Sequence, residues 1–224
     1  MKELESLDAA FVIDTFLLLL IGIGPKIALV PFLDMTAGMT ESTKRRVMRK
    51  MLTTAAVVAA LLLILGGLLT RLLHFSPGAL GVASGIILLI IAATMVLGQG
   101  DGNGGGNAGA HGGGHQIIGR DPMQVAVFPL AVPYLLNPAG IVVLVTLSAE
   151  ASSLAVLGVA VGVLVVVLAL DVVVFRWATA VSSKLDASRM LVTEKVFGFL
   201  LAALGVQLVL NGLADVGVIH LTGH

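Results

Sequence analysis

The sequence predicts an all-α protein that crosses a lipid bilayer six times. Apolar residues make up 58% of its 224 residues and charged residues only 12%, about half the usual share in a soluble domain. Six apolar segments are each long enough to span the hydrocarbon core, which takes about 20 helical residues. Most of the charge lies in the connections between them. We therefore expect a polytopic helical membrane protein.

The first expected span follows an N-terminal segment with three acidic residues and one lysine, MKELESLDAAF. This charge is the wrong sign for the start of a signal peptide, so we expect the first helix to be retained. Two connections, residues 35–51 and 176–191, are basic and are expected to be loops or amphipathic turns. The six expected spans cover residues 11–34, 52–73, 79–98, 124–147, 153–175 and 192–213.

The basic residues predict the orientation of these spans. Ten lie on one side of the expected topology and only Lys2 and Arg71 on the other, and an excess of Lys and Arg marks the cytoplasmic side. Both termini are therefore expected outside a plasma (inner) membrane. The ten are Lys44, Arg45, Arg46, Arg49, Lys50, Arg120, Arg176, Lys184, Arg189 and Lys195.

The two halves of the chain resemble each other. Aligning residues 84–100 with 197–213 places Gly85 opposite Gly198. Because each half has three spans, the second half would enter the membrane from the opposite side, which predicts a 3+3 inverted-topology repeat. The expected units are residues 1–98 and 124–224. Residues 99–123 join them, in a segment with eleven glycines among residues 98–119 that we expect to be a flexible tether.

Matched helix breaks predict a binding site. Gly24-Pro25-Lys26 interrupts the first span, and Asn137-Pro138 with Gly140 interrupts the fourth. Proline in a helix interior removes a hydrogen bond, and a broken span presents half-helix ends near the middle of the membrane. A half-helix N-terminus attracts a carboxylate, and Lys26 would add a full charge. Ordinary proline kinks, with Lys26 reaching the interface, are the alternative.

Other polar residues lie within the apolar spans. Asp171 is the candidate for proton or Na⁺ coupling, because an acid within a span must face protein, water or a cation; Arg176 is its candidate partner. Gln207 and Asn211 are four residues apart on one helix face. They are expected either to line the substrate pathway or to join helices.

Several segments together resemble the MarC family of six-helix bacterial and archaeal membrane proteins, within the broader LysE-type exporter superfamily. They are residues 66–98, the stretch FPLAVPYLLNPAGIVVLVTLS at 128–148, VPFLDMTAGMTESTKRR after the first proline motif, and VQLVLNGL in the last helix. The family usually has Asn/Asp-Pro-x-Gly in helix 1 and Gly-Pro-Gly in helix 4, whereas this chain has Gly-Pro-Lys and Asn-Pro-Ala-Gly. The resemblance implies a transporter or exporter of small neutral amino acids.

Two other functions stay open from the sequence. A divalent metal or cation exporter would use Asp171 with His111 and His115 of the linker, and a non-transporting membrane scaffold needs no site at all. We expect no enzyme, since no catalytic constellation is present, and no cofactor or resident metal. The expected partners are a small-molecule substrate, H⁺ or Na⁺, and the lipid bilayer, without nucleic acid. Assembly into a homo-oligomer stays open.

Overall fold

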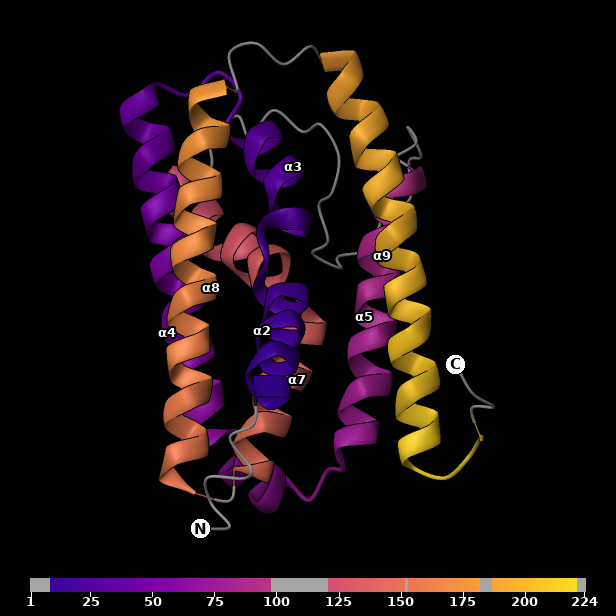
Figure 1. The fold of residues 1–224 in the computed structure, drawn as a ribbon. Coiled ribbons are helices and arrows are strands. Elements are labelled where there is room, and N and C mark those ends of the chain that lie inside the picture. Colours follow the sequence, from indigo (N-terminus) through magenta and orange to yellow (C-terminus); the bar gives the residue numbers. More distant parts are fainter. Residues whose placement is uncertain (1–8, 98–120, 152, 182–186, 221–224) are drawn as a thin grey trace.

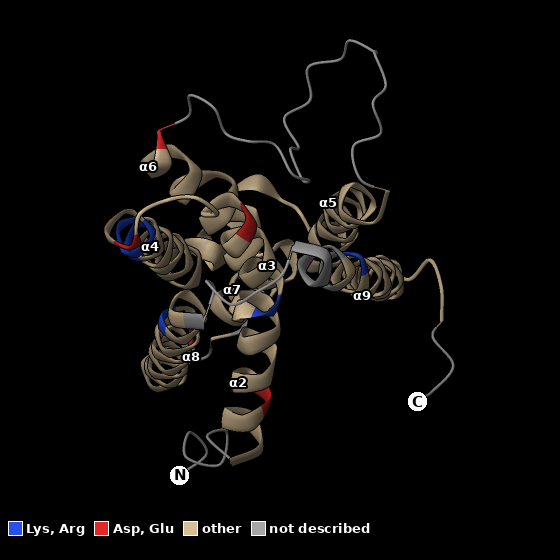
Figure 2. Ribbon diagram, turned by 90° about the horizontal axis from the view of Figure 1, so that it is seen from above, with Lys and Arg blue, Asp and Glu red and all other residues tan. Residues whose placement is uncertain are grey.

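The computed structural model describes residues 9–97, 121–151, 153–181 and 187–220 (Figure 1), and this part of the chain is helical with no strand. Long helices stand side by side (Figure 1), and α3 and α7 lie centrally among them, whereas α2 runs from the centre outward to the N-terminus (Figure 2). The elements are α2 Ala9–Ile23, α3 Pro25–Met35, α4 Glu41–Leu73, α5 Pro77–Leu97, α6 Pro122–Val125, the π-helix η1 Ala126–Leu135, α7 Pro138–Glu150, α8 Leu154–Val181 and α9 Ala187–Asp215.

Five membrane spans are long and apolar enough to cross a bilayer, and a bent pair of helices makes a sixth if it counts as one span. The bent pair joins Pro122–Leu135 to Pro138–Ala149 at an angle of 69°. The expectation of an all-helical, multi-pass membrane protein is therefore confirmed, with five candidate spans, the first of them formed by α2 and α3 together, and the bent pair. The length and composition of the bent pair fit either one broken span or a re-entrant loop.

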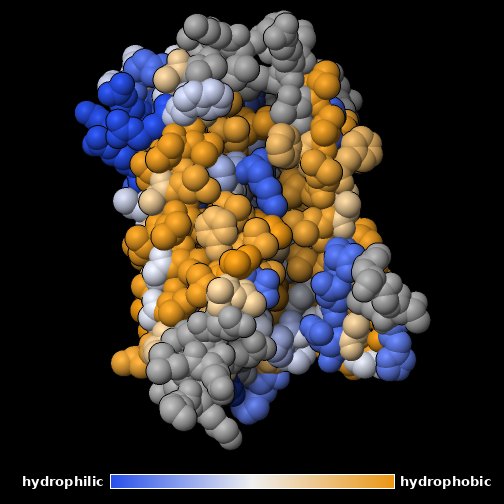
Figure 3. All heavy atoms as spheres, viewed as in Figure 1, coloured by the Kyte–Doolittle hydropathy of each residue, from blue (hydrophilic) through white to orange (hydrophobic). Residues whose placement is uncertain are grey.

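The surface supports a membrane location. Figure 3 shows a broad hydrophobic band over the long helices, with hydrophilic residues gathered toward the ends. Large apolar side chains such as Leu68, Val165 and Phe199 are more than half exposed along these helices. A soluble monomer rarely exposes an apolar surface of this extent, because water contact with it is unfavourable. Lipid acyl chains are the natural solvent for this band.

Three helices extend beyond the expected span ends: α4, α8 and α9, which begins at Ala187, within the second expected loop. Residues 41–51, expected to be a basic loop or turn, form the start of α4, where the side chain of Thr40 caps the helix by accepting from the Thr43 N–H. Residues 176–181 likewise continue α8. Hydropathy locates only the part of a helix that lies inside the hydrocarbon core. The helix α4 has 33 residues and is roughly 50 Å long. It therefore continues beyond a hydrocarbon core of about 30 Å.

The expected linker falls mainly outside the described residues. Residues 98–120, including His111 and His115, are not described, so the expected tether and its histidines stay predictions. The last residues assigned to the linker are helical or capping. The Asp121 carboxylate accepts from the Met123 N–H at 2.9 Å and caps α6.

Glycines bring α5 and α9 close together along their length. A Cβ on Gly85 would lie 2.6 Å from the Gly205 carbonyl oxygen, and one on Gly78 would lie 2.7 Å from the Gly212 carbonyl oxygen. Small residues of this kind allow helix backbones to approach closely in a bilayer. Near the end of α5, the Lys195 ammonium donates to the Met95 carbonyl at 2.8 Å, where a positive charge favours the helix C-terminus.

Candidate functional site

The first helix is interrupted at Gly24. The helix α2 ends at Ile23, Gly24 is extended with φ −67° and ψ 157°, and α3 begins at Pro25. Because Pro25 has no N–H, the Ile21 carbonyl four residues earlier loses its usual helical partner. A Cβ on Gly24 would overlap the Leu20 carbonyl oxygen, so the break requires glycine at this position.

The second break lies between η1 and α7. The backbone leaves helical geometry at Phe128 and Val132, each of which precedes a proline, as expected from the clash between a proline ring and the residue before it. Leu136 and Asn137 are extended, and α7 begins at Pro138. The chain therefore changes direction sharply before it enters α7.

Asn137 joins the two breaks. Its side-chain amide donates to the Ile21 carbonyl at 2.9 Å, and its backbone N–H donates to the Gly22 carbonyl at 3.1 Å. Its side-chain oxygen accepts from the Gly140 N–H at 3.0 Å and so caps α7. The Asn137 side chain is fully buried. The carbonyl that Pro25 leaves without a helical donor is thus satisfied by a residue from the other half of the chain.

Glycines make this contact possible. A Cβ on Gly22 would overlap the Gly140 Cα, and a Cβ on Gly140 would overlap the Gly22 carbonyl oxygen. The two backbones touch directly where α2 ends and α7 begins. Sequence reasoning selected Gly140 but missed Gly22, although its spacing in Gly22-Ile23-Gly24-Pro25 was a signal that small residues gather at the break.

Lys26 does not point into the buried junction. Its side chain is exposed, whereas those of Ile27 and Ala28 are buried. The first turn of α3 has no side-chain cap, because the capping position is Gly24. Backbone N–H groups at such a turn have no helical acceptor and carry partial positive charge. The positive ends at this break are therefore the uncapped turn of α3 and the neighbouring Lys26 side chain.

Asp171 lies in the interior of the bundle on α8. It is fully buried, and neither carboxylate oxygen has a hydrogen-bond partner among the described residues. It shares the buried face of α8 with Val167 and Phe175, and the ring of Phe175 packs edge-on against Phe32 of α3 at 5.2 Å. A carboxylate in such a place is stable only when a proton or a cation neutralises it.

The expected pairing of Asp171 with Arg176 is wrong. Both Asp171 oxygens are unpartnered, and Arg176 is exposed at the end of the bundle. Five residues along a helix correspond to a rotation of about 140° beyond one full turn, so the two side chains leave α8 on different faces. This rotation was available from the sequence and excludes the pairing.

Gln207 and Asn211 share a helix face, as expected, but they bond to each other. The Gln207 amide donates to the Asn211 side-chain oxygen at 2.7 Å on the exposed surface of α9. The structure therefore brings Gly24, Pro25, Asn137, Pro138 and Gly140 to one junction and leaves Gln207 and Asn211 outside it. Among the described residues, no group of three His, Cys, Asp or Glu side chains is placed to hold a metal ion.

Comparison with known proteins identifies the family. A sequence profile described as "MarC family integral membrane protein" matches residues 9–216. The chain belongs to the MarC family. The resemblance seen in the sequence is thus confirmed, and both breaks of this MarC protein lie inside the matched region. The chain is also similar to the UPF0056 membrane protein YvbG of Bacillus subtilis (strain 168), with 27% identity over 91% of this chain and 94% of that protein. No solved structure matches it.

Proposed function

We propose that this MarC protein is a secondary transporter that exports small neutral amino acids, or related small molecules, across the plasma membrane by alternating access. The observation that carries the proposal is the junction of two broken spans through Asn137. Broken spans whose ends meet inside the membrane form substrate sites in several transporter folds. A break also interrupts the hydrogen-bond ladder, which gives each span a point at which it can bend.

The substrate site of this proposal lies at the first turn of α3. The substrate carboxylate would accept from the uncapped N–H groups after Gly24, and Lys26 would supply the positive charge that balances it. Asn137 would act as a latch, since its bonds to Ile21 and Gly22 hold the breaks together. Movement of α7 away from α2 would exchange these bonds for contacts with water or substrate.

The proposed mechanism includes a 3+3 inverted repeat. In support, corresponding helices of the two halves contact each other: α2 with α7, α4 with α8, and α5 with α9. The first span of each half is also the broken one. In this arrangement the two halves would rock about the shared junction and open it alternately to either side.

Asp171 is the proposed coupling residue. A buried carboxylate without a partner can gain a proton or Na⁺ from one side and lose it to the other when the helices around it move. The helix that carries Asp171 packs against both α2 and α3. Neutralisation of Asp171 would therefore affect the helices on either side of the first break.

A transport assay in proteoliposomes tests the proposal. The unaltered protein is expected to accumulate radiolabelled alanine or serine in response to a proton or Na⁺ gradient. Lys26→Ala is expected to raise the KM about tenfold, which corresponds to the loss of one charge-assisted hydrogen bond. Uptake that matches protein-free liposomes for every small neutral amino acid would contradict the proposed substrate class. An unchanged KM in Lys26→Ala would contradict the role of Lys26.

Substitution of Asp171 separates coupling from binding. Asp171→Asn is expected to abolish gradient-driven accumulation and to preserve substrate exchange without a gradient, because the amide keeps the shape of the acid but cannot cycle a proton or Na⁺. Asp14→Asn is the matched control, since Asp14 is exposed on α2, and it should leave both activities intact. Full accumulation by Asp171→Asn would exclude Asp171 as the coupling residue.

A further inference from the structure

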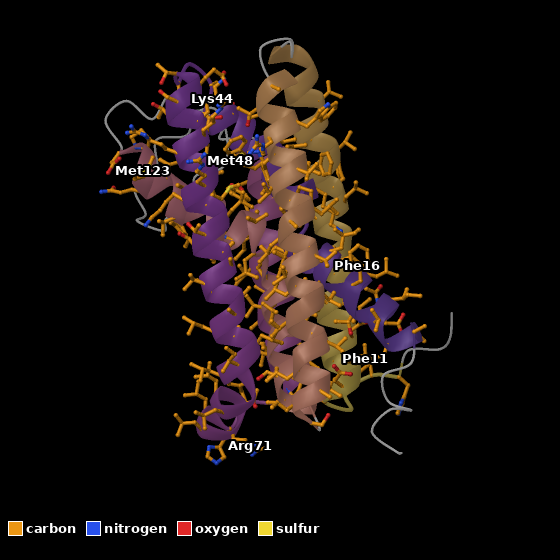
Figure 4. All side chains as sticks on the ribbon, turned by 60° about the vertical axis from the view of Figure 1, so that its left-hand side comes forward. Phe11, Phe16, Lys44, Met48, Arg71 and Met123 are labelled. Atoms are coloured by element: carbon orange, nitrogen blue, oxygen red, sulfur yellow. The ribbon has the colours of Figure 1, made fainter. Side chains whose placement is uncertain are left out.

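A cleft lies at the basic end of the molecule, where α4 begins and α8 ends. It has a volume of about 280 Å³, and its charged lining comes from both helices: Arg45 and Arg49 from α4, Arg176 from α8, and Glu41. Figure 3 shows the hydrophilic cluster that covers the start of α4. Figure 4 shows Lys44 and Met48 at the same end of α4, next to α8. Two helices thus contribute guanidinium groups to one hollow.

In the described part of the chain, the arginines of this cleft form no ion pair with an acidic side chain. Among the described residues, the one ion pair at this end joins Glu41 to Lys44, at 3.2 Å. Arg45, Arg49 and Arg176 form no ion pair there and are exposed. Three guanidinium groups around a small cleft favour an anion with several acceptor oxygens, and a phosphate fits the forked donor geometry of arginine.

The surfaces of α4 and α8 on the membrane side of the cleft indicate that this phosphate belongs to a lipid. On α4, Val57 and Leu61 lie eight and twelve residues after Arg49 and are 59% and 51% exposed. On α8, Val173 is 64% exposed and lies three residues before Arg176. Trp177 is 67% exposed beside Arg176, and tryptophan is enriched where the headgroups meet the hydrocarbon. A phosphate held by these arginines therefore has exposed apolar side chains further along both helices, toward the middle of the membrane.

We propose that the cleft between α4 and α8 binds the phosphate headgroup of an anionic phospholipid, whose acyl chains lie along the exposed valine and leucine side chains of the two helices. Basic pockets between membrane helices recognise anionic headgroups in this way. The bound lipid would bridge α4 and α8. The site is separate from the proposed substrate junction and does not depend on what the protein transports.

The single tryptophan of the chain provides a direct measurement. The full-length protein would be reconstituted in phosphatidylcholine vesicles that contain increasing fractions of phospholipid with brominated acyl chains, which quench tryptophan fluorescence on contact. Brominated phosphatidylglycerol is expected to quench Trp177 at a mole fraction about tenfold lower than brominated phosphatidylcholine, a difference of about 1.4 kcal/mol, because arginines near the membrane surface attract anionic headgroups. Equal quenching by the two lipids would overturn the proposal, and this comparison requires no variant.

Two double variants with the same change in net charge then locate the site. Arg45→Gln with Arg49→Gln is expected to reduce the preference for phosphatidylglycerol to about threefold or less. Arg46→Gln with Lys50→Gln is the matched control, because both residues lie at the same end of α4 and neither lines the cleft between α4 and α8; Arg46 lines only a neighbouring hollow on α4. This double variant should keep most of the preference. An equal loss in both doubles would indicate diffuse attraction and overturn the proposal.

A competition experiment separates a lipid from a free anion. Inorganic phosphate at about 10 mM should leave the quenching by brominated phosphatidylglycerol equal to that in sodium chloride of the same ionic strength, because general screening is then matched. If phosphate alone removes the preference, the cleft is a site for soluble phosphate and the assignment to a lipid is wrong.

Discussion

At the scale of single residues, Asn137 has the most specific role. It is fully buried, and its side chain makes two hydrogen bonds, one to the Ile21 carbonyl and one from the Gly140 N–H. Asn137→Ala leaves the Ile21 carbonyl without its donor and removes the cap of α7. We expect the unfolding free energy to fall by about 2–4 kcal/mol, the sum of these two effects. Unfolding in mixed detergent micelles, followed by circular dichroism, measures the change.

Two further variants isolate the cause of this loss. Asn137→Asp keeps the oxygen that caps α7 but replaces the amide donor to Ile21, so its stability should be no higher than that of Asn137→Ala. Asn211→Ala is the control, because Asn211 is exposed and bonds to Gln207 one turn away; it should change stability by about 0.5 kcal/mol or less. Equal stability of Asn137→Ala and the unaltered protein would contradict the bridging role.

Residue reasoning from the sequence predicted the junction in part. The proline breaks at Pro25 and Pro138 could be placed because proline leaves a known gap in the helix ladder. The donor that fills this gap could not be predicted, because the hydrogen bond from Asn137 to the Ile21 carbonyl depends on how two distant spans pack. The exposure of Lys26 could not be predicted either. It depends on how α3 is rotated about its axis, and the sequence does not show this rotation because nearly every face of α3 carries apolar residues.

At the scale of helices, glycine sets the distance between α2 and α7. Gly22→Ala and Gly140→Ala should each force these backbones apart, since the added Cβ overlaps backbone atoms of the other helix. We expect each to cost at least about 1–3 kcal/mol, the usual range for overpacking a well-packed site. Thermal unfolding of the purified variants provides the comparison.

The matched controls for these variants are Gly158→Ala and Gly162→Ala in α8. A Cβ at either position meets nothing within 4 Å, so both should be neutral or stabilising by about 1 kcal/mol at most. If the four variants lose stability equally, the loss at Gly22 and Gly140 does not come from contact between α2 and α7, because Gly158 and Gly162 make no such contact. If Gly22→Ala and Gly140→Ala match the unaltered protein, the close approach of the two helices is wrong.

The helices themselves were mostly predictable, with errors at their ends. Apolar runs located every span to within a few residues of a helix, since only such runs can lie in hydrocarbon. The start of α4 was misjudged because five residues between Lys44 and Lys50 are charged. A helix can nevertheless continue into the headgroup region when a residue such as Thr40 caps it. The Thr-Glu-Ser-Thr sequence at 40–43 carries that signal.

At the scale of the whole molecule, charge should decide the orientation in the membrane. Five basic residues lie in the first turns of α4, between Lys44 and Lys50, whereas Arg71 lies near its other end. The excess predicts that α4 begins in the cytoplasm. Single cysteines can test this because the chain has none of its own. Ser42→Cys and Ser76→Cys are suitable, since both serines are exposed and stand just inside the start of α4 and just past its end.

A membrane-impermeant thiol reagent should label Ser76→Cys in intact cells and Ser42→Cys only in inside-out vesicles. Cysteine is close to serine in size. Ser76→Cys weakens the bond that the Ala79 N–H donates to Ser76 at the start of α5, a local change that should not alter the side of the membrane on which the residue lies. The unaltered protein should remain unlabelled, and both variants should react after denaturation, which shows that each thiol is present. The opposite pattern would place the basic end outside and reverse the proposed orientation. The arginine cleft would then face the outer leaflet, and the anionic lipid would have to come from there.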